Sequence, residues 1–287
     1  MELIDVSKVE YPFGHNFYEL NNTKMHYVDE GQGDVVVMVH GNPTWSFYYR
    51  NLIKHLSKSF RVIAIDHIGC GLSDKPIDYN YTLEQRINDL TGLLFSLKLS
   101  KYSMVVHDWG GAIGFGHAVE HTQNIDKMII LNTAAFLSQE IPFSISLCKN
   151  KFFGPFIVKY LNAFCYPATF LSTEKKLSKV VKKAYLAPYS KPKLRQAISE
   201  FVQDIPLDKN HGSYDLLKQI ESKLTDLSGK KLILWGGKDF CFNDHFFKKW
   251  QEIYPEAQYK YYEGAGHYIL EDEKEDTLFL IEKFLKD

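Results

Sequence analysis

One acidic residue, Asp108, stands where the chain changes from a strand-like to a helix-like pattern. The segment reads Val105-Val106-His107-Asp108-Trp109-Gly110-Gly111, with a mainly apolar run at 103–106 before it and helical apolar spacing through 112–119 after it. This pattern predicts a strand, a sharp turn and a helix, and Gly110 removes a Cβ that would block the turn. A side chain at the tip of such a turn is pushed out at the top of a sheet, which makes Asp108 a candidate nucleophile. The alternative is an Asp that only caps the following helix.

A histidine near the end of the chain is the candidate base. His267 closes the segment Gly264-Ala265-Gly266-His267, just after an expected strand at 258–262. A histidine within reach of a carboxylate nucleophile can move the protons of the reaction. His107 is expected to be a packed neighbour of the turn, and other histidines, such as His26, occupy positions typical of the surface or a sheet edge.

A second carboxylate is needed to orient the histidine. Asp239 follows the expected strand at 231–235, and it would accept the histidine N–H and fix the tautomer. The other place for such an acid, after the expected strand at 127–131, reads Asn132-Thr133-Ala134 and has no carboxylate. Asp244 is a weaker rival, because it reads better as an early residue of a helix.

Two further side chains could hold negative charge. His40-Gly41-Asn42-Pro43 follows a buried apolar run, and Asn42 offers an amide N–H there, while Trp109 offers an indole N–H beside Asp108. Two donors that converge on one point would bind an anion or a developing negative charge. Their structural alternatives are a turn residue before proline for Asn42 and core packing for Trp109.

Composition excludes several classes of protein. The chain has 287 residues, of which 45% are hydrophobic and 24% are charged. Its formal net charge is −1, so electrostatics give no reason to expect binding to nucleic acid. It has no uninterrupted apolar run of about 18 residues, and residues 1–5 lack the pattern of a signal peptide. The four cysteines are scattered, without the spacing of a metal site, and we expect buried thiols in a cytoplasmic protein.

Strands alternate with helices along most of the chain, which predicts a mostly parallel sheet with helices on both faces. Strands are expected in a hairpin at 17–29 with a turn at Asn21-Asn22, and at 35–40, 61–66, 103–106, 127–131, 231–235 and 258–262. Helices are expected at 45–56, 83–97, 243–254 and 271–286. Residues 136–211 contain no convincing strand, so we expect a main domain of residues 1–135 and 212–287 with an inserted helical cap at 136–211.

The expected cap is rich in aromatic residues. They are Phe143, Phe152, Phe153, Phe156, Tyr160, Phe164, Tyr166 and Phe170. The segment at 152–171 could be a membrane-surface helix, but two prolines interrupt it and it lacks a basic face. We therefore expect it to form a wall of the substrate pocket.

Five motifs together resemble the haloalkane dehalogenase superfamily of α/β-hydrolases. They are HGNP, DHIGCGLSDKP, VVHDWGG, GKD and GAGH, in the order nucleophile, acid, histidine. Asn42 and Trp109 match the halide-binding pair of many dehalogenases, and the acid at Asp239 matches the third dehalogenase subgroup. The longer stretches HGNPTWSFYYR, LNTAAF, FVQDIPL and GAGHYILEDE look like the β-lactone decarboxylases of bacterial long-chain olefin synthesis.

The resemblance implies an α/β-hydrolase fold and covalent catalysis by Asp108, His267 and Asp239. In a decarboxylase, Asp108 would open a cis-β-lactone (a 3,4-dialkyl-oxetan-2-one) at the ring carbonyl or at the carbon bearing the ring oxygen, and loss of CO2 would leave a long-chain alkene. In a haloalkane dehalogenase, Asn42 and Trp109 would hold the halide, and water activated by His267 would cleave the ester to an alcohol. No metal or organic cofactor is implied, and the expected partners are a small hydrophobic substrate and other olefin-pathway enzymes.

Two other functions are compatible with parts of the pattern. An epoxide hydrolase would need cap tyrosines as acids, and Tyr160, Tyr166, Tyr185 and Tyr189 are available, but Asn42 argues against it. A binding protein on a hydrolase scaffold would keep a pocket without turnover, but all three triad positions are chemically intact.

Overall fold

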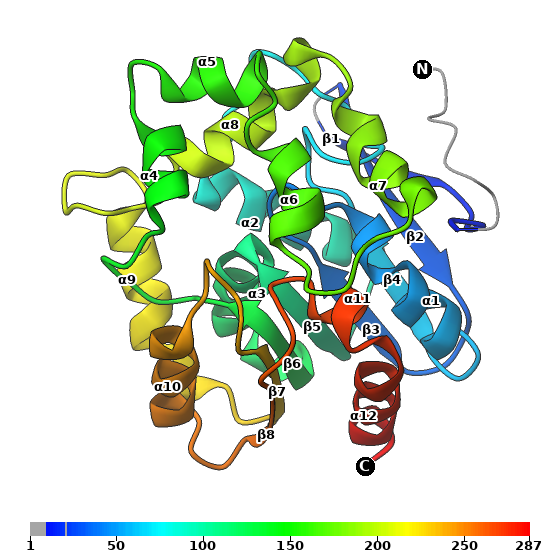
Figure 1. The fold of residues 1–287 in the computed structure, drawn as a ribbon. Coiled ribbons are helices and arrows are strands. Elements are labelled where there is room, and N and C mark those ends of the chain that lie inside the picture. Colours follow the sequence, from blue (N-terminus) through cyan, green and yellow to red (C-terminus); the bar gives the residue numbers. More distant parts are fainter. Residues whose placement is uncertain (1–9, 21) are drawn as a thin grey trace.

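The computed structural model describes residues 10–20 and 22–287 (Figure 1). Residues 1–5, which lack the pattern of a signal peptide, and the expected turn residue Asn21 lie outside the described residues. The described chain forms one eight-stranded sheet in the order β1-β2-β4-β3-β5-β6-β7-β8. Its strands are β1 (Asn16–Leu20), β2 (Thr23–Glu30), β3 (Val35–Val39), β4 (Arg61–Ile65), β5 (Tyr102–Asp108), β6 (Ile125–Thr133), β7 (Lys230–Gly236) and β8 (Gln258–Tyr262).

The sheet is parallel from β4 through β8, and β1 and β2 form the expected antiparallel hairpin at one edge. The central strand β5 is buried along its whole length, as its apolar sequence predicts for a strand covered on both faces. Because parallel strands end at the same edge of a sheet, the loops after β3, β5, β7 and β8 meet there. That edge therefore receives the predicted chemical residues of all four loops.

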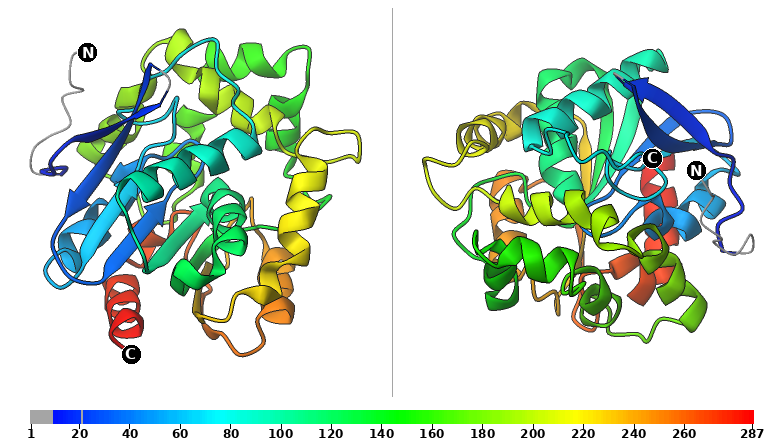
Figure 2. Two further views of the ribbon diagram at one scale, coloured as in Figure 1. Left: turned by 180° about the vertical axis from the view of Figure 1, so that it is seen from behind. Right: turned by 90° about the horizontal axis from the view of Figure 1, so that it is seen from above.

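Helices cover both faces of the sheet (Figure 2). Helix α2 packs on α3 on one face, and α1 packs on α12 on the other. The helices are α1 (Arg50–Leu56), α2 (Leu83–Ser96), α3 (Trp109–Glu120), α4 (Phe143–Lys149), α5 (Gly154–Lys159), α6 (Cys165–Leu171), α7 (Lys179–Leu186), α8 (Gln196–Gln203), α9 (Tyr214–Ser222), α10 (Asp244–Ile253), α11 (Ile269–Asp272) and α12 (Lys274–Lys286). The predicted α/β-hydrolase fold class is confirmed.

Two expected helices differ in detail. The helix expected at 45–56 begins as a 3-10 turn, Ser46–Tyr49, before α1. The helix expected at 271–286 is divided at Glu273 into α11 and α12. The carboxylate of Asp272 accepts from the backbone N–H groups of Gly266 and Lys175, which ties this point of the chain to two other segments.

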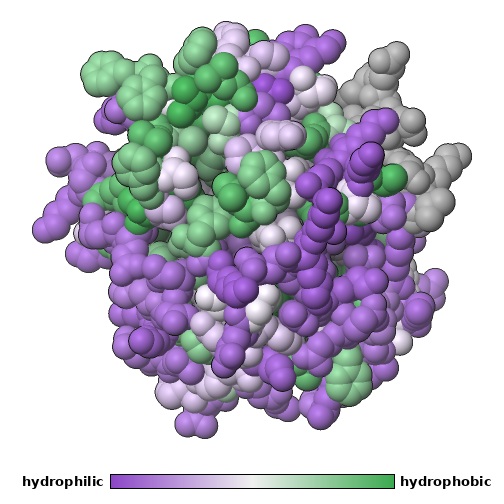
Figure 3. All heavy atoms as spheres, viewed as in Figure 1, coloured by the Kyte–Doolittle hydropathy of each residue, from purple (hydrophilic) through white to green (hydrophobic). Residues whose placement is uncertain are grey.

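Helices α4 to α8 lie between β6 and β7 in the sequence and above the carboxyl ends of the strands in Figure 1. Helix α9 packs instead on α3, beside the sheet. The surface in Figure 3 divides in the same way, since hydrophobic residues gather over α4, α5 and α6 and hydrophilic residues cover the lower half. No helix within the described residues is long and apolar enough to cross a bilayer.

Candidate active site

Asp108 ends β5 and lies at the predicted sharp turn into α3. Its backbone has φ 52° and ψ −130°, a conformation that non-glycine residues rarely adopt. A Cβ on Gly110 would lie 2.0 Å from the carbonyl oxygen of Val39, so the turn requires glycine there, as predicted. Asp108 precedes the first residue of α3, but its side chain makes no capping hydrogen bond, so the reading as a helix cap is wrong. The carboxylate is free for other partners.

The Asp108 carboxylate is buried and contacts two groups. Its Oδ1 accepts from the backbone N–H of Asn42 at 2.5 Å, and its Oδ2 lies 3.6 Å from Nε2 of His267. A Cβ on Gly41 would lie 2.0 Å from Oδ1, so only glycine leaves room for the carboxylate beside this loop. The loop after β3 thus supplies a backbone donor to the Asp108 carboxylate.

His267 lies between the two carboxylates. Its Nδ1 is 2.7 Å from Oδ2 of Asp239, on the opposite side of the ring from Asp108. Oδ1 of Asp239 accepts from the backbone N–H groups of Cys241 and Phe242, so both oxygens of this buried carboxylate are bonded. Asp239 is therefore fixed toward the histidine, while the rival Asp244 is the first residue of α10 and accepts from Tyr261.

The two carboxylates change the protonation of His267. Burial by itself lowers the pKa of the imidazole, but Asp239 and Asp108 outweigh it and raise the pKa to about 10. His267 is therefore an imidazolium at neutral pH, held between two negative groups.

His107 packs against the site as expected and supports its backbone. Its Nε2 donates to the carbonyl oxygen of His267 at 2.9 Å, and its ring stacks on Tyr48. Burial holds the pKa of His107 well below its usual range, so the ring is neutral. The expectation for His26 was wrong, because its ring is fully buried and bonds to Asp66.

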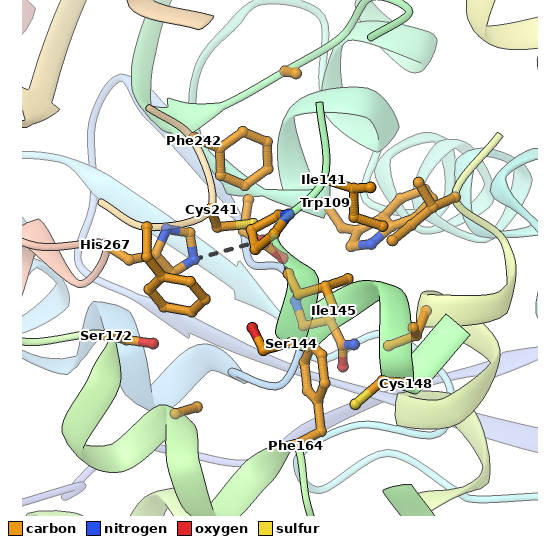
Figure 4. Close-up of a pocket in the computed structure, with 18 of the residues that line it drawn as sticks. Trp109, Ile141, Ser144, Ile145, Cys148, Phe164, Ser172, Cys241, Phe242 and His267 are labelled. Atoms are coloured by element: carbon orange, nitrogen blue, oxygen red, sulfur yellow. Dashed lines mark hydrogen bonds and ion pairs between the residues drawn. The ribbon is translucent and has the colours of Figure 1, made fainter. Parts of the chain in front are cut away.

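Asn42 and Trp109 both line the pocket above Asp108. Nδ2 of Asn42 donates one hydrogen bond, to the carbonyl oxygen of Ile198 in α8, which leaves its second N–H for the pocket. Within the described residues, Oδ1 of Asn42 has no partner. Trp109 packs on Phe201 and lies across the pocket from His267 (Figure 4).

The rest of the pocket wall is mostly apolar. Ile141, Ile145, Cys148 and Phe164 line it from α4 and the segments before α4 and α6 (Figure 4). Further apolar residues come from α6, from the end of α8 and the segment after it, and from the loop after β7, among them Ala168, Leu171, Val202, Ile205, Phe240 and Phe242. Such a wall suits an alkyl chain.

Two expectations about this wall need correction. Of the eight cap aromatics, Phe164 lines the pocket, whereas the other seven are exposed. Helix α6 lines the pocket with Pro167, Ala168 and Leu171 instead, and no residue of α5 lines it. Cys241 is also not a buried thiol, since it is partly exposed and lines the pocket; the other three cysteines are buried.

Asn132 was missed as a site residue. Its side-chain amide donates to Oδ2 of Asp239 and bonds both polar backbone atoms of Gly236. The sequence did contain a signal, because Asn132 follows the strand expected at 127–131, and this strand neighbours the one before Asp239. A polar side chain at that point faces the same edge of the sheet.

The alpha/beta hydrolase fold family matches residues 34–274, which is most of the chain. This protein belongs to that family. It is 43% identical to the cis-3-alkyl-4-alkyloxetan-2-one decarboxylase of Shewanella oneidensis, over 96% of this chain and 89% of the relative. It is 27% identical to haloalkane dehalogenase 2 of Mycobacterium bovis, over 91% of each chain.

Solved structures agree on the fold. The crystal structure of haloalkane dehalogenase DatA from Agrobacterium tumefaciens has a TM-score of 0.87 and 22% identity, and the match covers 95% of this chain and 96% of that one. The predicted resemblance is therefore confirmed, with named decarboxylases more similar in sequence than the dehalogenases. The protein is an enzyme of this family.

Proposed function

We propose that this enzyme is a cis-3-alkyl-4-alkyloxetan-2-one decarboxylase, which converts a cis-β-lactone with two alkyl chains to an alkene and CO2. The observation that carries the proposal is the buried Asp108 carboxylate at the base of an apolar pocket, with His267 at 3.6 Å. The 43% identity to a relative of that name supports the choice of substrate.

Asp108 is proposed as the nucleophile. The strained ring has two electrophilic carbons, the ring carbonyl and the carbon that bears the ring oxygen. Attack on the carbon bearing the ring oxygen breaks that C–O bond and gives an alkyl ester with a free carboxylate. That carboxylate then leaves as CO2, its electron pair forms the double bond, and the Asp108 carboxylate is expelled. Attack on the ring carbonyl gives a mixed anhydride and a β-alkoxide instead. The alkoxide must then attack the Asp108 carbonyl carbon and expel the substrate carboxylate, which forms the same alkyl ester, before CO2 can leave.

His267 and Asp239 are proposed to assist expulsion of the Asp108 carboxylate from the alkyl ester. Conversion of a β-lactone to an alkene and CO2 consumes no water, so His267 is not required as a base toward water. Its raised pKa keeps it positively charged beside Asp108, where it stabilises the carboxylate as it is expelled. Asp239 holds the ring in place and stabilises the imidazolium.

Asn42 and Trp109 are proposed to hold the lactone oxygens. The backbone N–H of Asn42 already contacts Oδ1 of Asp108 and would stay with this oxygen in the ester. The free side-chain N–H of Asn42 and the indole N–H of Trp109 are then donors for the carboxylate that the opened ring exposes.

A haloalkane dehalogenase is the second candidate, because the Asn42 and Trp109 donors suit a halide as well as an oxygen. In that reaction His267 would act on water after Asp108 has lost its charge in the ester. An epoxide hydrolase has less support, since none of the four cap tyrosines considered for it lines the pocket. Tyr160 and Tyr166 are exposed. Tyr185 donates to Glu271, and Tyr189 donates to the carbonyl oxygen of Thr44.

We also propose that residues 136–211 form a cap that selects the substrate, and that the enzyme works in the cytoplasm together with other enzymes of olefin synthesis. The thiols of the four free cysteines support a reducing compartment. Co-purification of the untagged chain with such enzymes tests the assembly.

The test of the proposed reaction is detection of an alkene from a long-chain cis-β-lactone, with Asp108→Ala as the matched control. Asp108→Ala removes the atom that forms the covalent bond and is expected to give no alkene above background. A folded Asp108→Ala variant with normal turnover would overturn the proposed mechanism.

A further inference from the structure

The outer surface of the cap is unusually apolar. Six aromatic side chains on or beside α4, α5 and α6 are between 48% and 96% exposed, and we call them the cap face: Phe143, Phe152, Phe156, Tyr160, Tyr166 and Phe170. Phe156 stacks on Tyr160, and Tyr166 lies edge-on to Phe170, so neighbours on this face contact each other. Figure 3 shows this side as a continuous hydrophobic area over α4, α5 and α6. Contiguous exposed apolar surface of this kind marks an interaction site.

The cap face is continuous with the mouth of the pocket. Helix α4 lines the pocket with Ile145 and Cys148 and exposes Phe143 on the surface. In α6, Leu171 does both, since it lines the pocket and is 52% exposed. Leu171 therefore joins the exposed surface of α6 to the lining of the pocket.

Charge is distributed unevenly between the cap and the rest of the chain. Residues 136–211 hold 12 of the 34 Lys and Arg residues and 5 of the 35 Asp and Glu residues. This segment has a formal net charge of +7, and the remainder of the chain has −8. The overall charge of −1 conceals this difference.

Six lysines of the cap are exposed and make no ion pair with a carboxylate of the described residues. Lys151 lies between α4 and α5, and the others lie on α7 or in the segments on either side of it: Lys176, Lys179, Lys183, Lys191 and Lys193. The exposed acids Glu140 and Glu174 contact Asn243 and Lys238 of the main domain instead. The cap therefore presents exposed lysines beside its aromatic rings, since Lys151 directly precedes Phe152 and α7 contacts α6.

This composition favours a lipid surface over a protein partner. Protein interfaces are enriched in Arg and depleted of Lys, whereas the exposed cations of the cap are lysines and its one arginine, Arg195, is buried. Aromatic rings with adjacent lysines are the pattern of surfaces that lie on anionic bilayers, with the rings at the headgroup level and the ammonium groups on the phosphates. We propose that the cap face docks on an anionic lipid bilayer and turns the mouth of the pocket toward it.

Vesicle flotation tests this docking with the full chain and no substrate. The wild type is expected to float with vesicles of phosphatidylcholine and phosphatidylglycerol in equal parts, more weakly with pure phosphatidylcholine, and more weakly in high salt. Phe152→Ser with Phe156→Ser should weaken binding to the anionic vesicles at least about tenfold, because both rings lose their apolar contact with the bilayer. Lys179→Glu with Lys183→Glu should weaken it by about tenfold or more, and only on the anionic vesicles.

Two matched controls lie outside the cap. Phe279→Ser removes a 61% exposed ring of α12, and Lys248→Glu reverses an exposed charge of α10, and both should bind vesicles like the wild type. Circular dichroism verifies the fold of every variant. Because these positions are solvent-exposed, none of the substitutions disturbs the core.

Three results would overturn the docking. The first is a wild type that floats with neither vesicle, and the second is a Phe152→Ser and Phe156→Ser variant that binds as the wild type does. The third is concentration-dependent self-association in sedimentation that this variant abolishes while vesicles do not bind, which would make the cap face a protein interface. The assay contains no substrate, so each of these failures leaves the proposed reaction untouched.

Discussion

The side-chain amide of Asn132 donates to Oδ2 of Asp239 at 3.0 Å, and the same oxygen lies 2.7 Å from Nδ1 of His267. Asn132 also accepts from the N–H of Gly236 and donates to its carbonyl oxygen. The end of β6 and the loop after β7 are thus joined through one buried side chain. Asn132 therefore positions Asp239. The same segment, Asn132-Thr133-Ala134, was the other expected place for the acid, and it contains no carboxylate.

Replacing Asn132 by Ala is expected to lower the free energy of unfolding by about 1.5–3 kcal/mol, because a buried carboxylate loses a hydrogen-bond donor. Urea unfolding measures this change. The alkene assay should show a lower kcat with a nearly constant KM, since the amide does not line the pocket. Unchanged stability and kcat would show that Asn132 has no positioning role.

Asp239→Asn tests the acid itself. The amide keeps the shape but favours the wrong histidine tautomer, a change that costs about four orders of magnitude in a serine-protease triad. We expect a smaller but large loss of kcat here. The matched control is Asp244→Asn, which changes the rival carboxylate and should keep nearly full activity. A loss below about tenfold for Asp239→Asn would assign the orienting role to another carboxylate.

The fold and the triad were predictable because each rests on local pattern. The strand, glycine turn and helix around Asp108 are local features of the sequence. Asp108, Asp239 and His267 each end or follow an expected parallel strand, and such strands end at the same edge of the sheet. The direction of the cap aromatics was not predictable, because helices of six or seven residues with prolines show no clear periodicity that separates inward from outward. Contacts between distant segments, such as Asn132 with Asp239, depend on strand order in the sheet.

Neutralising Asp108 should release the proton of His267. The pKa of His267 is raised to about 10 by Asp239 and Asp108 against the effect of burial, so Asp108→Asn removes one of the two raising charges. The imidazole pKa, measured by NMR titration, is expected to fall toward neutral pH in this variant. In the wild type the pKa of His267 is higher in the folded than in the unfolded protein, where it is near 6.5. The charged ring therefore contributes fully to the free energy of unfolding below about pH 6.5, and this contribution is lost as pH rises through about 10. An unchanged pKa in Asp108→Asn would mean that Asp108 does not interact with the imidazolium.

His267→Gln should accumulate the covalent intermediate. Without the positive ring, the Asp108 carboxylate is expelled more slowly, so lactone is expected to remain attached to the protein. Intact-protein mass spectrometry measures the added mass of one lactone, and peptide mapping locates it on Asp108. Brief hydroxylamine treatment, which cleaves an anhydride faster than an alkyl ester, identifies the carbon attacked. Normal turnover, or the absence of any adduct, would contradict this role of His267.

The central claim is that this active site turns a cis-β-lactone into an alkene. One enzyme preparation is incubated with a long-chain cis-β-lactone and, separately, with 1-bromobutane, and alkene is measured by gas chromatography while free bromide is measured by a colour assay. Asp108→Ala serves as the control in both reactions. We expect alkene from the lactone and little or no bromide, with neither product from the variant. Fast bromide release without alkene would contradict it and would make the enzyme a haloalkane dehalogenase.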